Sequence, residues 1–88
     1  MPAKLKNEQT TTVDLGQDTA LAIKNLVDVE VLVYVDCKAN GHYSPITGER
    51  RLGAGGEFVR SRVQLGHEHV RVGVRGPDDG RDLVLVSP

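Results

Sequence analysis

The chain has 88 residues, with 11 basic and 12 acidic side chains and a formal net charge of −1. This balance argues against generic binding to nucleic acids or membrane surfaces, which favours a basic excess. A domain of this length removes only about 60% of the unfolded chain's surface on folding, so we expect one domain with a thin core.

The apolar residues are mostly small and branched, with thirteen valines, nine leucines and only three aromatic side chains. Such a set packs well between β-sheets and leaves little room for a ligand cavity. The single cysteine, Cys37, excludes a disulfide within the chain. No stretch has the apolar length of a signal peptide or the roughly 20 residues of a membrane span, so we expect cytoplasmic synthesis and no membrane partner.

Residues 1–10 are polar and lack periodicity, which predicts a flexible N-terminal arm ahead of a single domain at 11–88. This arm either frays or docks on a partner, and its composition fits both. Short alternations of apolar and polar residues then predict strands at 12–15 and from Leu21 onward, separated by Gly16.

The strongest strand pattern lies at residues 29–36, where valines occupy every second position. The opposite face carries Glu30, Leu32, Tyr34 and Asp36. Leu32 and Tyr34 therefore need cover, either from a second subunit or from a loop or the arm of the same chain. The dipeptide Asn40-Gly41 predicts a tight turn after this strand.

Residues 58–65 and 68–75 predict a β-hairpin around a two-residue loop, Gly66-His67. In this register Val63 faces Val70, and basic residues likewise face basic residues. One side of the hairpin would then present Arg60, Arg62, Arg71 and Arg75.

The end of the chain predicts a turn at 76–80 and a continuous apolar strand at 83–86. Four apolar residues in a row indicate burial on both faces, and hence a central or an interface strand. Taken together, the strand signals predict an all-β fold, a small antiparallel β-sandwich of six to seven short strands without a substantial helix.

Residues 20–36 combine an alternating strand, a polar break and a long valine strand, and Gly55-Gly56-Glu57-Phe58 leads into a further strand. Over residues 12–87 this pattern resembles minimal immunoglobulin-like sandwiches. Such domains are common as accessory or decoration proteins of bacteriophage particles and as adhesion modules. The resemblance implies an immunoglobulin-like fold and a structural role in the virion, as a capsid decoration protein that docks on a larger assembly and forms homo-oligomers.

Other motifs predict no catalytic or metal chemistry. Gly53-Ala54-Gly55-Gly56 lacks the lysine of a phosphate-binding loop and precedes a strand, so we expect no helix N-terminus there to hold an anion. His67, His69 and Cys37 match no ligand spacing of a known metal site. No catalytic motif surrounds the serines or carboxylates. We therefore expect neither an enzyme nor a bound metal or cofactor.

The four arginines, together with Leu32 and Tyr34, are the predicted partner-binding residues. Guanidinium groups favour carboxylates and phosphates, and without aromatic residues beside them an acidic protein is preferred over a nucleic acid. In the alternative interpretation, carboxylates of the same chain neutralise the arginines, and Glu30 and Asp36 are the natural candidates. Two functions stay open: an accessory protein on a larger assembly, or a small regulatory or inhibitor protein that blocks an acidic or phosphate-binding partner.

Overall fold

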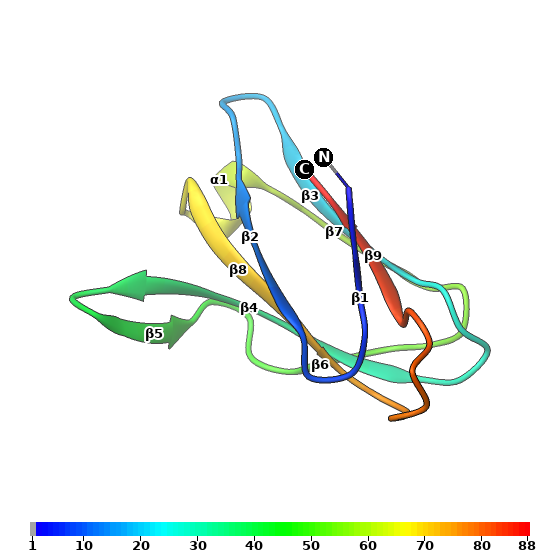
Figure 1. Cartoon of the computed structure of the whole chain (residues 1–88). Helices are drawn as coiled ribbons and strands as arrows, with labels where there is room; N and C mark the ends of the chain where they lie inside the picture. Colours follow the sequence, from blue (N-terminus) through cyan, green and yellow to red (C-terminus); the bar gives the residue numbers. More distant parts are fainter. Residues whose placement is uncertain (1) are drawn as a thin grey trace.

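The computed structural model describes residues 2–88 and shows two antiparallel β-sheets with the core between them (Figure 1). Its elements are β1 (Ala3–Leu5), β2 (Thr10–Asp14), β3 (Ala20–Asn25), β4 (Val31–Ala39), β5 (His42–Pro45), β6 (Arg50–Leu52), β7 (Glu57–Ser61), α1 (Arg62–Leu65), β8 (His69–Arg75) and β9 (Val84–Ser87). The predicted all-β fold is confirmed, with more strands than the six or seven expected. In the described part of the chain, no helix has the length and apolar character needed to cross a membrane.

One sheet, sheet A, has the strand order β1-β9-β3-β7, and the other, sheet B, has the order β2-β8-β4-β5. β5 pairs with residues 36–39 of β4, and β6 pairs with residues 31–33 of the same strand. Between them the backbone amides of Ile46 and Thr47 both donate to the carbonyl oxygen of Val35. β5 and β6 therefore form one outer strand with an interruption.

Strands that follow one another in sequence mostly lie in different sheets. With β5 and β6 counted as one strand, the first strand pairs with the last, the second with the last but one, and so on inward. The chain thus corresponds to one long antiparallel hairpin wrapped into two sheets, the arrangement of a jelly roll. Its tip is the predicted turn at Asn40-Gly41, where both residues have positive φ angles of 52° and 81°.

This strand order differs from the immunoglobulin order that the sequence pattern resembles. In immunoglobulin domains the first two strands are neighbours in one sheet and the last two are neighbours in the other. Here β1 and β2 lie in different sheets, as do β8 and β9, and β9 lies between β1 and β3. The coarser prediction, a small all-β domain of two antiparallel sheets, is the part that is confirmed.

The predicted hairpin around Gly66-His67 is wrong, because β7 belongs to sheet A, β8 belongs to sheet B and α1 connects them. Ser61 caps α1. Its side-chain oxygen accepts a hydrogen bond from the backbone amide of Gln64, and its backbone amide donates to the side-chain oxygen of Gln64. This capping box, followed by Gly66 in the left-handed conformation, turns the chain away from the strand direction. Val63, predicted to face Val70, is 86% exposed on the helix.

Residues 3–5, predicted to lie in a flexible arm, form β1 and pair with β9. Leu5 is buried, and its carbonyl oxygen accepts a hydrogen bond from the Leu83 amide. Three residues are too few to show an alternation, so periodicity alone cannot reveal this strand. Met1, the first residue of the predicted arm, lies outside the described residues.

β9 is central in sheet A, as its continuous apolar run predicts. Leu83, Val84 and Val86 are at most 1% exposed, whereas Leu85 lies half-buried on the outer face of the sheet. The core around them consists mainly of leucine and valine side chains from both sheets. Sheet packing of this kind accounts for the small aliphatic composition.

Asn25 is a polar residue inside this core, with 2% of its surface exposed. Its side-chain nitrogen donates to the carbonyl oxygens of Val29, Leu52 and Gly53, and its side-chain oxygen accepts from the Val27 amide. The side chain thereby joins the β3–β4 connection to the end of β6. Its hydrogen bonds offset the cost of burying an amide group.

Candidate functional site

β4 divides its side chains between the core and the outer face of sheet B. Val31, Val33 and Val35 are each 1% exposed, so the residues between them point outward. Directly paired residues of antiparallel strands share a face, which extends this surface onto the neighbouring strands. The outer face of sheet B carries Thr12, Asp14, Leu32, Tyr34, Asp36, Lys38, Tyr43, His69, Arg71 and Arg75.

Arg71 lies in the middle of this face, paired with Thr12 on β2 and with Asp36 on β4. Its Nε and Nη2 donate to Oδ1 and Oδ2 of Asp36 at 2.9 and 2.5 Å. These hydrogen bonds raise the pKa of Arg71. The guanidinium carbon also lies 3.5 Å from the ring centroid of Tyr43, a cation–π contact.

The β4–β5 hairpin projects from the body of the sandwich (Figure 1). All four residues of β5 are exposed, and Tyr43 keeps 47% of its surface accessible although its ring packs on Arg71. Lys38 lies directly opposite Tyr43, with its Nζ 6.0 Å from the ring centroid. It takes part in none of the ion pairs found among residues 2–88. The hairpin therefore combines an exposed aromatic ring with an uncompensated ammonium group.

His69 and Asp14 face each other across β8 and β2. His69 Nδ1 lies 2.5 Å from Asp14 Oδ1, and this hydrogen bond raises the pKa of His69 above its ordinary value of 6.5. The charge of Glu68 acts in the same direction, whereas slight desolvation and the charge of Arg62 lower this pKa. Because the contact uses Nδ1, the Nε2 atom of the ring remains available.

These side chains surround a shallow cavity of about 140 Å³. Its lining consists of Thr12, Lys38, Tyr43, His69, Val70 and Arg71. The charged groups of this lining are cationic, and the adjacent carboxylates of Asp14 and Asp36 are already bonded to His69 and Arg71. The cavity is therefore suited to an anionic group.

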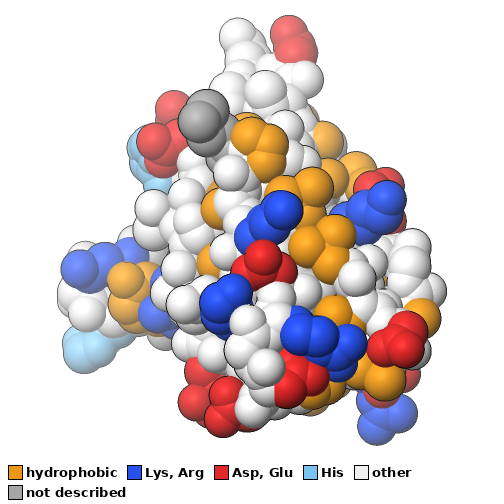
Figure 2. Space-filling view, turned by 45° about the vertical axis from the view of Figure 1, so that its right-hand side comes forward, with side chains coloured by type: hydrophobic (Ala, Val, Ile, Leu, Met, Phe, Trp, Pro, Cys, Tyr) orange, Lys and Arg blue, Asp and Glu red, His pale blue; other side chains and the backbone are white. Residues whose placement is uncertain are grey.

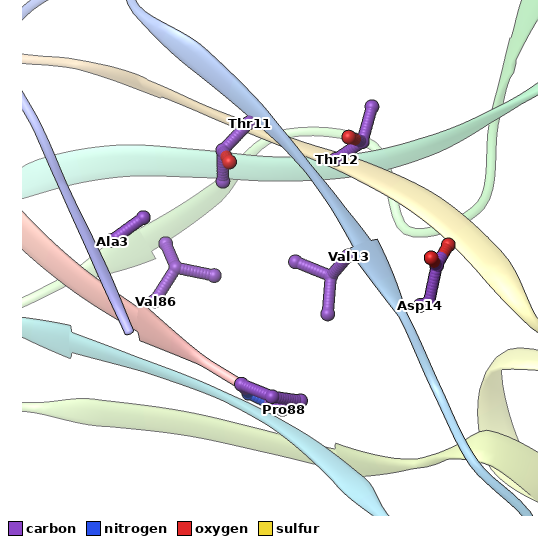
Figure 3. A pocket seen from close by; sticks show the side chains of 7 residues that line it. All are labelled: Ala3, Thr11, Thr12, Val13, Asp14, Val86 and Pro88. Atoms are coloured by element: carbon purple, nitrogen blue, oxygen red, sulfur yellow. The ribbon is translucent and has the colours of Figure 1, made fainter. Parts of the chain in front are cut away.

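A larger cavity of about 260 Å³ opens on the other side of β2, between the edges of the two sheets (Figure 3). Its lining consists of Ala3, Thr11, Thr12, Val13, Asp14, Val86 and Pro88. The charged side chain in this set is Asp14, whose carboxylate is bonded to His69. This cavity thus offers fewer groups for recognising a ligand than the one beside Tyr43.

Four of the six predicted partner-binding residues lie on the outer face of sheet B: Leu32, Tyr34, Arg71 and Arg75. Leu32 and Tyr34, which were expected to need cover, are half-buried. The ring of Tyr34 lies over Gly73, where an added Cβ would be 2.1 Å from Tyr34 Cζ. Glycine at this position therefore allows the ring to lie close to the backbone of β8.

Arg60 and Arg62 lie elsewhere, so the predicted face of four arginines is wrong. Arg60 belongs to β7 in sheet A, and its guanidinium carbon lies 4.4 Å from the ring centroid of Phe58. Arg62 belongs to α1, with its Nη2 3.7 Å from Oε2 of Glu68. The helix moves the chain from one sheet to the other, which separates the two halves of the predicted face.

Folding also pairs arginines with carboxylates of the same chain. Asp36 binds an arginine of the predicted set, whereas Glu30, the other candidate for this role, lies 3.9 Å from Arg51 Nε through its Oε1. Arg75 Nη1 lies 3.9 Å from Glu49 Oε2. Figure 2 shows mixed charges on one side of the molecule, where Lys and Arg alternate with Asp and Glu around hydrophobic side chains.

Lys38, Tyr43 and His69 are members of the site that were not predicted from the sequence. The turn signal at Asn40-Gly41 could have placed Lys38 beside Tyr43, because a two-residue loop sets these residues opposite each other. His69 joins them through the pairing of β8 with β2 and β4, and its partner Asp14 is 55 residues away in sequence. Local pattern carries no information about a contact of that range.

Two of the three residues considered for a metal site, Cys37 and His67, lie next to each other. Cys37 Sγ is 3.7 Å from His67 Nε2, while His69 bonds to Asp14 instead. Within residues 2–88 no group of three or more histidine, cysteine or acidic side chains is arranged to hold a metal ion.

Comparisons of the chain with known protein families, curated proteins and solved structures gave no match. A function is therefore inferred from the geometry of the outer face of sheet B.

Proposed function

We propose that this protein is a non-enzymatic binding domain that docks on a larger protein assembly through the outer face of sheet B. The observation that supports this most directly is the stacked pair of Tyr43 and Arg71 at the projecting hairpin. Tyrosine and arginine are among the residues that contribute most to protein interfaces. Because Asp36 holds Arg71 and Arg71 supports the exposed ring, little side-chain freedom is lost on binding.

The outer face of sheet A is a weaker candidate for this role. Its central positions carry Ala22, Lys24, Val59 and Leu85, which are mostly small or aliphatic. Val59, at 44% exposure, is one of its few well-exposed apolar side chains. Interface cores are enriched in aromatic residues and arginine and depleted of lysine and alanine, so this composition favours sheet B.

The assembly we propose is a bacteriophage-type capsid, with the protein as a decoration subunit that enters the virion after synthesis in the cytoplasm. This part rests on the resemblance to accessory sandwiches and on a fold-level analogy, since viral capsid domains and lectins also use jelly rolls. A decoration subunit is expected to form homo-oligomers, which sedimentation of the purified protein would reveal.

The projecting hairpin also favours a second candidate, a small inhibitor that inserts the Asn40-Gly41 tip into a cleft of one soluble partner. Exposed loops on a rigid scaffold are common binding elements. The cationic side chains near the hairpin would then contact an acidic wall of that cleft.

A site-specific photo-crosslinker separates these candidates. A photoreactive phenylalanine analogue replaces Tyr43 in one variant and Ala22, on sheet A, in a matched control. Both variants are irradiated in extract from cells that make the protein, and particles are separated from soluble proteins on a density gradient. We expect crosslinks to the particle fraction from position 43 and none from position 22.

Crosslinks from position 43 to one soluble protein would instead support the inhibitor. Equal crosslinking from both positions would contradict docking through sheet B.

A further inference from the structure

We propose that the cavity of about 140 Å³ beside Tyr43 binds the carboxylate of a glutamate or aspartate side chain of the docking partner. This inference rests on the proposed function, because it names the chemistry that the outer face of sheet B recognises. Thr12, Lys38, His69 and Arg71 line the cavity and supply the hydrogen-bond donors.

The cavity keeps unused donors although two of its cations are already paired. Arg71 bonds to Asp36 through Nε and Nη2, which leaves Nη1 for a further acceptor. His69 bonds to Asp14 through Nδ1, which leaves Nε2. Lys38 belongs to none of the ion pairs among the described residues, so its ammonium group has no carboxylate to lose before it binds a new one.

The charge of the site favours a ligand group with a single negative charge. Lys38 and Arg71 balance the two carboxylates of Asp14 and Asp36, and His69 adds one positive charge when it is protonated. A carboxylate is neutralised by this surplus. A phosphate, with a charge of about −1.5 to −2 at neutral pH, would leave uncompensated negative charge beside two carboxylates.

The size of the cavity indicates that the carboxylate arrives on a larger body. Pockets that enclose free small molecules usually measure about 300–1,000 Å³, whereas this one measures about 140 Å³. It has room for the end of one side chain, with the Tyr43 ring beside the methylene stem. An acidic residue on a protein surface meets both requirements.

The test titrates the purified full chain with a blocked tripeptide that has glutamate between two glycines, followed by NMR. The control peptide has glutamine in place of glutamate. We expect the glutamate peptide to shift the signals of Lys38, Tyr43, His69 and Arg71, and the glutamine peptide to leave them in place. Peptide concentrations up to about 20 mM detect even millimolar affinity.

Two lysine variants provide a matched comparison. Lys38→Gln should weaken binding of the glutamate peptide by about fivefold. Lys24→Gln removes the same charge from the outer face of sheet A and should change the affinity by less than about 1.5-fold. Equal effects of the two substitutions would overturn the proposal, because they would indicate general attraction to net charge.

Two further ligands test the chemical class. Inorganic phosphate that binds more tightly than the glutamate peptide would overturn the preference for a single charge. Free glucuronate that binds as tightly and shifts the same signals would overturn the assignment to a protein side chain. No shift with any ligand would overturn the site.

The titration uses no assembly, so its result is independent of the crosslinking result. Peptide binding without crosslinks from position 43 would leave the carboxylate site standing and refute the docking function. Crosslinks to particles without peptide binding would support the docking function and refute the carboxylate site.

Discussion

Arg71 on β8 and Asp36 on β4 lie directly opposite each other and form a bidentate ion pair between residues 35 positions apart in sequence. The two side chains are 24% and 9% exposed. At this depth, losing one partner leaves a charge that water compensates only in part. The same guanidinium group packs against the ring of Tyr43. The ion pair therefore stabilises sheet B and also positions an exposed side chain of the candidate site.

Asp36→Asn should lower the free energy of unfolding by about 2 kcal/mol, because Arg71 loses its compensating charge and one of its two acceptor oxygens. Urea denaturation of the two proteins measures this difference. Asp82→Asn is the matched control, since it breaks an ion pair with Lys6 in which the side chains are more exposed, at 40% and 46%. A loss as small as that of the control would show that Arg71 is adequately solvated without Asp36.

Gly73→Ala should lower the free energy of unfolding by about 2 kcal/mol, because the new Cβ occupies the space of the Tyr34 ring. The reason is specific to that ring, so a double-mutant cycle isolates it. In a Tyr34→Ala background the same substitution should cost less than about 0.5 kcal/mol. An equal cost in both backgrounds would point to the backbone of β8 instead.

Asn25→Ala should lower the free energy of unfolding by about 3 kcal/mol, since it removes the donor to the buried carbonyl group of Leu52 and to the partly buried carbonyl groups of Val29 and Gly53. Thermal and urea denaturation measure this loss. Gln17→Ala changes an exposed amide side chain and serves as the control, with little change expected. A loss below about 1 kcal/mol would mean that water replaces the Asn25 side chain.

Local patterns in the sequence predicted several strands, although Val29, expected in the valine strand, is exposed ahead of β4, and residues 62–65 form α1 instead of a strand. The alternation of valines in β4 correctly separates its buried face from Leu32 and Tyr34, because a side-chain period of two is a local property. The turn at Asn40-Gly41 and the burial of β9 follow from equally local signals.

Which strands become neighbours was not predicted, because it depends on how the whole chain wraps. Apolar residues at Val63 and Val70 fit a hairpin, yet the chain leaves the strand at Ser61. The capping box of Ser61 and Gln64, with Gly66 after it, was visible in the sequence and predicts a helical turn there. The candidate site was missed for the same reason, since four strands, β2, β4, β5 and β8, bring its side chains together.

His69 should titrate with a pKa above 6.5, because its hydrogen bond to Asp14 stabilises the protonated ring. NMR of the imidazole protons as a function of pH measures this value. Asp14→Asn should lower the pKa of His69 clearly. Glu68→Gln should lower it less, because Glu68 acts through charge alone.

The raised pKa of His69 also fixes the direction of a pH effect on stability. Protonated His69 stabilises the folded chain fully below the unfolded pKa near 6.5, and this contribution is lost as the pH rises through the folded pKa. Wild type should therefore exceed Asp14→Asn in stability most clearly at about pH 5–6, below the unfolded pKa of His69, and the two should converge at higher pH. Affinity for the glutamate peptide should fall as the pH rises through the folded pKa of His69, because the ring then loses its positive charge. Asp14, Glu68 and Arg62 are the charged groups that act on this ring. A stability difference that grows toward alkaline pH would contradict the assigned pair.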